Sequence, residues 1–269
     1  MMGRWPAALA AAALLLLPPA PTGAAEALRC SAPEELTGFR VPLPNTARAI
    51  RHGKALVIVA IGSSSTEGFG ASDQAHTYPA RLAEELRRRW PRLAVTVINK
   101  GVGGEMTAQT MARFERDVVA YRPQLVIWQT GSNQVLRGED VESYARAIRD
   151  GIGRLKAARM DVVLMDPQFA PRMVARPMHR AVVDSIEQAA NDMKVAVFRR
   201  FAVMRHWVSS GQYRVEDVIS RDGLHMNDAS YGCIARLLAD SLATAAHATP
   251  LPDEEAAAPG AGSAGPARR

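Results

Sequence analysis

Short apolar runs recur every 30 to 40 residues along the chain and leave few folds open to it. The first of them, ALVIVAI, shows no alternation of polar and apolar residues, as expected of a strand that is covered on both faces. Segments with a helical apolar pattern lie between the runs. This order predicts right-handed βαβ units and a doubly wound parallel sheet. The predicted strands are residues 55–61, 94–98, 124–128, 161–165 and 195–198.

Helices are predicted where apolar residues recur at intervals of three or four. Pro79 suits a first helical turn, and Gly151 and Gly153 weaken the third helix slightly. The last helix has Asn227 or Asp228 as its N-cap. Residues 201–207 show a less regular pattern. The other predicted helices cover residues 79–90, 107–120, 141–155 and 182–193.

The beginning of the chain has the pattern of a secretory signal peptide, which we assign to residues 1–27. A short basic start is followed by an 11-residue apolar run, which is too short to cross a bilayer as a helix. Cleavage is expected after Ala25 or Ala27. Arg29 precedes Cys30, where a lipoprotein signal would need a small residue. The mature protein is therefore expected to be periplasmic or secreted, with no integral membrane span.

The other end of the chain, residues 248–269, is rich in Pro, Gly and Ala and has no periodicity. Such a segment cannot bury enough apolar surface to offset its chain entropy, so we expect a disordered tail. Residues 28–247 remain as one domain with a sizeable core.

Net charge, cysteine content and ligand spacing indicate which binding partners and which cross-links to expect. The formal net charge is +6, but no basic stripe with interleaved aromatic residues accompanies it, so a nucleic-acid partner is not expected. The two cysteines, Cys30 and Cys233, are expected to form one disulfide in an exported protein. No pattern of metal ligands is present.

Four polar segments lie where open α/β sheets bind their ligands, outside the carboxyl ends of the strands. Each one alone is an ordinary turn, cap or loop. Because parallel strands share one carboxyl edge, the segments should converge, and together they supply a nucleophile, donors, a base and an acid. They are residues 62–68 (GSSSTEG), 99–104 (NKGVGG), 130–133 (TGSN) and 222–225 (DGLH).

These segments resemble the four sequence blocks of the SGNH (GDSL-like) hydrolase superfamily, in the same order and at compatible spacing. The resemblance implies Ser64 as nucleophile, Asp222 and His225 as the other triad members, and Gly104 and Asn133 in the oxyanion hole. It also implies a flavodoxin-like α/β fold, a three-layer α/β/α sandwich with a five-stranded parallel sheet. The strand count made from the apolar runs agrees with it.

The implied chemistry needs these residue types. A serine hydroxyl requires a base, His225, whose tautomer is set by a carboxylate, Asp222. The oxyanion requires fixed donors, here the N–H groups of Ser64 and Gly104 and the amide of Asn133. No metal or organic cofactor is needed.

One position departs from the family pattern. Ser63 stands where the superfamily usually has an aspartate, so three serines are adjacent. Ser64 is the expected nucleophile, with Ser63 and Ser65 as alternatives.

The expected activity is removal of small acyl (acetyl) groups from carbohydrate or cell-wall glycan, so the expected partner is a small-molecule or glycan ester substrate. In the loop at 166–172 (DPQFAPR), Gln168 and Arg172 are the candidates for substrate contact. The alternatives are a lysophospholipase- or thioesterase-like enzyme, an O-acyltransferase, and a non-enzymatic glycan-binding module.

Overall fold

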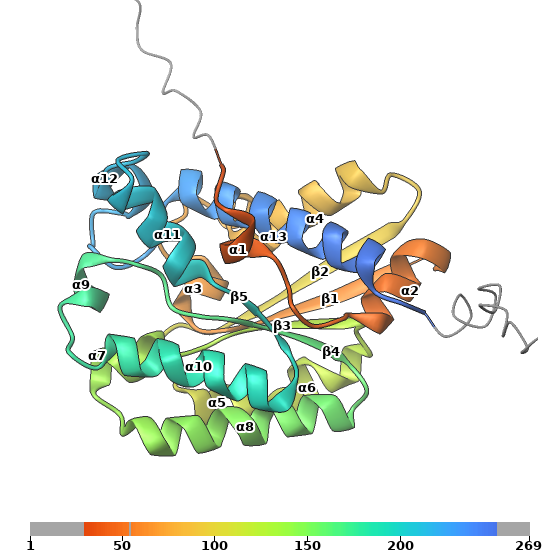
Figure 1. The fold of residues 1–269 in the computed structure, drawn as a ribbon, viewed down its shortest axis with the longest axis horizontal. Helices are drawn as coiled ribbons and strands as arrows, with labels where there is room; N and C mark the ends of the chain where they lie inside the picture. Colours follow the sequence, from red (N-terminus) through yellow and green to blue (C-terminus); the bar gives the residue numbers. More distant parts are fainter. Residues whose placement is uncertain (1–29, 54, 252–269) are drawn as a thin grey trace, which may run out of the picture.

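Five parallel strands form one sheet in the order β2-β1-β3-β4-β5, and helices cover both of its faces (Figure 1). The computed structural model describes residues 30–53 and 55–251. The single five-stranded parallel sheet with helices on both faces confirms the predicted α/β sandwich. The strands are β1 (Ala55–Gly62), β2 (Ala94–Gly101), β3 (Leu125–Gln129), β4 (Asp161–Met165) and β5 (Ala196–Phe198).

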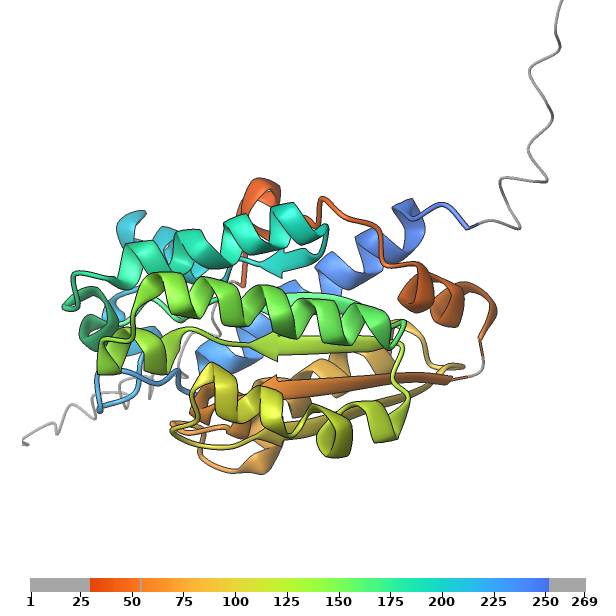
Figure 2. The same ribbon diagram turned by 90° about the horizontal axis from the view of Figure 1, so that it is seen from below.

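The helices divide between two layers. Figure 2, turned by 90°, shows α8 and α10 (green and teal) side by side over the sheet. One layer holds α1 (Glu34–Thr37), α2 (Pro44–His52), α4 (Tyr78–Arg89), α11 (Arg200–Ser209) and α13 (Asp228–Ala248). The other holds α5 (Thr107–Ala112), α6 (Phe114–Asp117), α8 (Val141–Ala157) and α10 (His179–Met193). Short elements at the ends of the strands are α3 (Ser64–Glu67), α7 (Ser132–Arg137), α9 (Pro171–Val174) and α12 (Val215–Val218), with single 3₁₀ turns at Gln74–His76 and Val119–Tyr121.

The core explains one glycine that the sequence presents as a weakness. The Trp128 side chain on β3 is fully buried and meets Phe114 edge-on, with ring centroids 5.1 Å apart. A Cβ atom at Gly151 on α8 would lie 2.3 Å from the Trp128 ring. Gly151 therefore lets α8 approach the sheet closely enough to cover this tryptophan.

One predicted helix was wrong, and helix α11 was not predicted. Residues 107–120 do not form one helix, because the chain breaks at Arg113 (φ −106°, ψ 9°) into α5, α6 and a 3₁₀ turn. The guanidinium of Arg113 is buried and hydrogen-bonded to other elements, and such tertiary contacts override local helical preference. Residues 201–207 belong to helix α11, whose buried residues include the charged Arg200, so the apolar pattern of this helix is weak.

The folded body extends past the predicted boundary at residue 247. The N–H of Leu43 donates to the Thr249 hydroxyl over 3.1 Å, and Leu251 is fully buried beside Ala47. These contacts are made with a segment far away in the sequence, so the loss of local periodicity did not mark the end of the folded body. The remainder of the predicted tail and the whole predicted signal peptide lie outside the described residues. Within residues 30–53 and 55–251 no helix has the length and apolar content to cross a bilayer.

A disulfide joins Cys30, just ahead of α1, to Cys233 in α13. The cysteines are 203 residues apart, so the bond closes a loop that includes every strand. The indole N–H of Trp207 adds a hydrogen bond of 2.8 Å to the carbonyl of Ser31. The N-terminal segment is thus attached to the helical layer both covalently and by hydrogen bonding.

We expect replacement of both cysteines by serine to lower the free energy of unfolding. Loop-closure entropy for so long a loop suggests an upper value of about 5 kcal/mol. Urea unfolding of the parent with and without reductant provides the control: reductant should lower the parent's midpoint and leave the variant unchanged. Equal midpoints for oxidised parent and variant would contradict a stabilising role.

Candidate active site

The four predicted segments meet at the carboxyl edge of the sheet. Figure 1 shows α3, α7 and α9, which follow β1, β3 and β4, at the same end of the molecule. Ser64 is the first residue of α3, Asn133 is the second residue of α7, and His225 lies in the loop before α13. Parallel pairing therefore places side chains from distant parts of the chain on one surface.

Ser64, His225 and Asp222 form a continuous hydrogen-bonded chain. The Ser64 Oγ lies 2.8 Å from His225 Nε2, and His225 Nδ1 is hydrogen-bonded to Asp222 Oδ2. An ionised carboxylate only accepts hydrogen bonds, so Nδ1 carries the proton and Nε2 is free to accept the serine proton. The arrangement has the geometry of a serine nucleophile with a general base and an orienting acid.

Asp222 is held as a carboxylate by its surroundings. Burial alone would raise its pKa, but a hydrogen bond from the His225 ring opposes this, as do the backbone N–H groups of His225 and Leu224 and the hydroxyl of Ser220. The balance places the pKa of Asp222 well below its ordinary value. The turn that carries His225 thereby also fixes its charged partner.

The three adjacent serines differ in what their hydroxyl groups contact. The Ser63 hydroxyl donates to Gln129 Oε1 over 3.2 Å, and the Ser65 hydroxyl donates to Gln168 Oε1 over 3.3 Å. Both serines are buried, whereas Ser64 is partly exposed. Of the three hydroxyls, that of Ser64 contacts His225.

The candidate oxyanion donors come from the serine turn (residues 62–68), the glycine loop (residues 99–104) and the start of α7. The N–H of Ser64 is at the first position of α3, where no intrahelical acceptor exists. Gly104 adopts a φ of +76°, a left-handed conformation that suits glycine. The Asn133 amide donates over 2.8 Å to the carbonyl of Glu105, and an amide nitrogen has a second proton to offer.

Gln168 is placed differently from the prediction that it contacts substrate. The Gln168 side chain is only 1% exposed. Its amide N–H donates to the Leu224 carbonyl over 3.0 Å. Its Oε1 accepts hydrogen bonds from the Ser132 hydroxyl and from Arg200, each at 3.1 Å. The prediction was wrong because a polar residue in a strand-end loop can point inward as well as outward. Through these buried hydrogen bonds Gln168 links the loop before Asn133 to the loop before His225.

Arg172, the second predicted substrate contact, stays a prediction. Its side chain is exposed, and its backbone N–H donates to the Gly223 carbonyl over 3.1 Å. It therefore lies beside the loop that carries Asp222 and His225.

Two residues of the site were missed in the sequence. Gln129 ends β3, is 1% exposed, and accepts the N–H of Ser63 over 2.9 Å. A single polar residue at the end of an apolar strand was the available signal. Phe69 is 53% exposed, and its ring centroid lies 5.5 Å from that of His225. Its position between two glycines, directly after the serine segment at 62–68, gave only an indirect hint.

A cavity in the described part of the chain lies at the opposite edge of the sheet from the candidate site. A cavity of about 550 Å³ is lined by Met160 and Val162 near the start of β4 and by Ala196 at the start of β5, at the amino-terminal edge of the sheet. It contains none of the candidate site residues, so we assign the site on the hydrogen-bonded geometry of Ser64 and His225. No group of three or more His, Cys, Asp or Glu side chains in residues 30–53 and 55–251 could hold a metal ion.

A family model, described as the non-GDSL lipase-like family, matches residues 29–248. The chain belongs to this family. The family name agrees with the absence of the usual aspartate at Ser63. The match covers the whole sheet and all candidate site residues, and the resemblance to the SGNH superfamily is confirmed.

Curated relatives of this non-GDSL lipase-like chain are esterases of several kinds. Acetylxylan esterase from Geobacillus stearothermophilus is 28% identical over 151 residues, covering 50% of this chain and 69% of that protein. Arylesterase from Vibrio mimicus is 24% identical over 69% of this chain and 87% of that protein. Thioesterase 1/protease 1/lysophospholipase L1 from Escherichia coli strain K12 is 23% identical over 71% of this chain and 86% of that protein.

Solved structures share the fold of this family member at low sequence identity. A two-domain esterase active on acetylated mannans superposes with a TM-score of 0.66 at 21% identity, covering 78% of this chain. The chain spans only 56% of that enzyme. TesA superposes with a TM-score of 0.60 at 20% identity, covering 70% of this chain and 99% of TesA. These likenesses establish the SGNH hydrolase fold.

The lowered pKa of Asp222 predicts how stability depends on pH. A carboxyl whose pKa is lower in the folded state stabilises the fold above its unfolded pKa of about 3.9 and loses this contribution as pH falls. Urea midpoints between pH 7 and pH 3 should therefore fall less in Asp222→Asn than in the parent. Asp184→Asn, at an exposed residue of α10, is the matched control and should follow the parent. Equal pH dependence in all three proteins would contradict the assignment.

Proposed function

We propose that this protein is an exported carboxylic-ester hydrolase in which Ser64 is the nucleophile, His225 the general base and Asp222 its orienting acid. The observation that carries the proposal is the 2.8 Å contact between Ser64 Oγ and His225 Nε2, with Asp222 on the other ring nitrogen. Membership of the family and the named esterase relatives support the class of carboxylic-ester hydrolase.

The reaction divides into two steps. His225 takes the hydroxyl proton as Ser64 attacks the ester carbonyl, and the imidazolium then protonates the departing alcohol. The oxyanion is stabilised by the N–H groups of Ser64 and Gly104 and by the Asn133 amide. Water, activated by the same histidine, then releases the acid from the acyl-enzyme. These steps need no metal ion or organic cofactor.

For the substrate we propose a small acyl group, such as acetyl, on a carbohydrate or cell-wall glycan. Two of the similar proteins are an acetylxylan esterase and an esterase active on acetylated mannans. Phe69 supports the same class, because its exposed ring stands beside His225, which must reach the leaving alcohol. The backbone that carries the ring is held at two points: the Phe69 N–H donates to the Ser64 carbonyl, and the Phe69 carbonyl accepts the Tyr231 hydroxyl over 2.7 Å. An aromatic face in this position suits packing against a sugar ring.

Export is part of the proposal. The predicted signal peptide at residues 1–27 would direct the chain across the membrane, and the disulfide between Cys30 and Cys233 is typical of oxidising compartments. A periplasmic or secreted enzyme would meet glycan esters there.

Labelling with a fluorophosphonate probe tests the nucleophile. The parent should be labelled and should hydrolyse p-nitrophenyl acetate, whereas Ser64→Ala should lose labelling and about 10⁴-fold or more of its turnover. Ser63→Ala and Ser65→Ala are the matched controls, since their hydroxyls contact glutamines, and both should remain labelled. An unlabelled parent, or a labelled Ser64→Ala, would overturn the assignment.

Chain-length preference tests the acyl group. The value of kcat/KM on p-nitrophenyl esters should be highest for acetate and fall as the acyl chain lengthens. Ser64→Ala gives the background at each length. A peak at eight or more carbons would instead favour the lysophospholipase- or thioesterase-like alternative, to which the Escherichia coli relative belongs. Transfer to a sugar that outpaces hydrolysis would favour an acyltransferase.

A further inference from the structure

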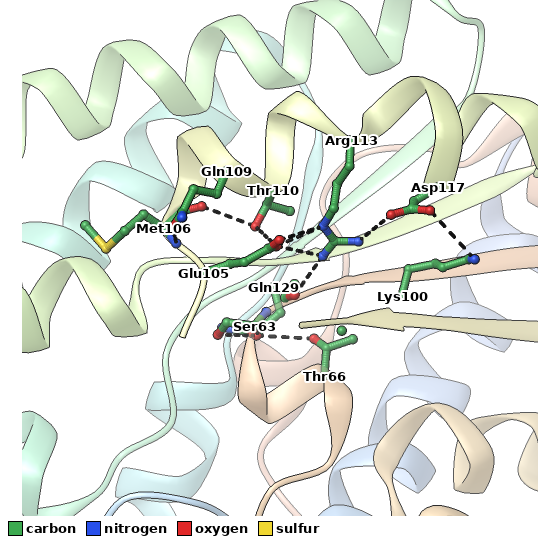
Figure 3. A network of polar contacts seen from close by, with 12 residues as sticks. Ser63, Thr66, Lys100, Glu105, Met106, Gln109, Thr110, Arg113, Asp117 and Gln129 are labelled. Carbon is green, nitrogen blue, oxygen red and sulfur yellow. Dashed lines mark hydrogen bonds and ion pairs between the residues drawn. The ribbon is translucent and has the colours of Figure 1, made fainter. Parts of the chain in front are cut away.

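A buried arginine contacts two residues that lie next to the candidate oxyanion donors in the sequence or close to them. Arg113, at the break between α5 and α6, is 7% exposed and sits between Glu105 and Asp117 (Figure 3). Its Nε lies 3.0 and 2.9 Å from the two carboxylate oxygens of Glu105, and its Nη1 lies 3.0 Å from Asp117 Oδ2. Its Nη2 donates to the carbonyl of Gly62 over 3.1 Å. Full pairing of this kind offsets the cost of burying a guanidinium.

The Gly62 carbonyl connects Arg113 to the nucleophile. Gly62 ends β1 and precedes Ser63 and Ser64. The same carbonyl accepts the N–H of Val102, from the loop that carries Gly104, over 3.0 Å. One carbonyl therefore holds the serine turn against both the arginine and the glycine loop.

Glu105 connects Arg113 to the other two oxyanion donors. It directly follows Gly104, and its backbone carbonyl accepts the Asn133 amide over 2.8 Å. Its carboxylate is held by Arg113 and by the Thr110 hydroxyl, 3.1 Å away. Glu105 is thus fixed at both its backbone and its side chain, between Gly104 and Asn133.

We propose that the Arg113–Glu105 ion pair is a positioning device for the oxyanion hole. The inference rests on the proposed function of Ser64. Donors stabilise a developing oxyanion only if they are already in place, and a displacement of about 0.5 Å is enough to weaken them. Arg113 touches no reacting atom, so it acts through Glu105 and Gly62 on the positions of Ser64, Gly104 and Asn133.

A positioning role differs measurably from a purely structural one. A residue needed only for folding changes the fraction of folded enzyme, while each folded molecule turns over at the normal rate. A residue that positions oxyanion donors changes kcat for each active site and leaves substrate binding nearly unaltered, because the lost interaction is made in the transition state.

The test compares Arg113→Lys and Glu105→Gln with Arg116→Gln as the matched control. Arg116 is 76% exposed on its side chain and contacts the same Asp117 at 2.8 Å, but it does not contact Glu105. Active sites are counted by fluorophosphonate labelling run to completion, and kcat and KM are measured on p-nitrophenyl acetate. Affinity for a trifluoromethyl ketone, which forms a tetrahedral adduct with serine, reports on the oxyanion hole itself.

We expect kcat per labelled site to fall about 10- to 100-fold in both Arg113→Lys and Glu105→Gln, with KM changed by no more than about 3-fold. Ketone affinity should weaken by a similar factor. Arg116→Gln should match the parent in all three measurements. Glu105→Gln serves as the second variant should Arg113→Lys fold poorly, because it leaves Arg113 paired with Asp117.

Unchanged kcat per labelled site in the two variants, even with lower stability, would overturn the positioning role and leave Ser64 as the nucleophile. A rise in KM with kcat unchanged would also overturn it. A parent that is not labelled at all would overturn the proposed function and this inference together.

Discussion

The site depends on the parallel pairing of β1 with β2 and β3. In this register Gly62 pairs with Gly101, and Ile61 pairs with Trp128, so the three strands end at nearly the same level. The serine turn (residues 62–68), the glycine loop (residues 99–104) and the loop with Asn133 (residues 130–133) therefore begin side by side. The order in which strands are added to the sheet also reverses at this point, since β1 lies between β2 and β3. Open α/β sheets bind their ligands in the crevice that forms at such a reversal.

Close approach at this edge requires the small residues that the chain has there. A Cβ atom at Gly101 would lie 1.9 Å from the backbone nitrogen of Glu67, and one at Gly62 would lie 2.8 Å from the carbonyl oxygen of Gln129. Any larger side chain would push the serine turn away from its neighbours. The spacing between the nucleophile and the candidate donors is thus decided by backbone packing.

Beneath the exposed residues lies a second layer of buried polar groups. Gln129 holds the serine turn, Gln168 links the loops beside Asn133 and His225, and Arg113 joins the serine turn to Glu105. A buried polar group destabilises the fold unless its hydrogen bonds are satisfied. The same requirement makes these groups rigid supports, because moving one loop would leave several donors and acceptors without partners.

The fold class, the order of the strands along the chain and the family resemblance could all be predicted from the amino-acid sequence, because apolar runs and polar strand-end segments are local patterns. The sequence marked Ser64, Asn133, Asp222 and His225 in the same way. Three features became visible only in three dimensions: Ser64, and neither neighbouring serine, contacts His225; Gln168 points inward; and the helix predicted at 107–120 breaks at Arg113. These outcomes depend on hydrogen bonds between residues far apart in the chain, and no local pattern specifies the partner of a buried polar side chain.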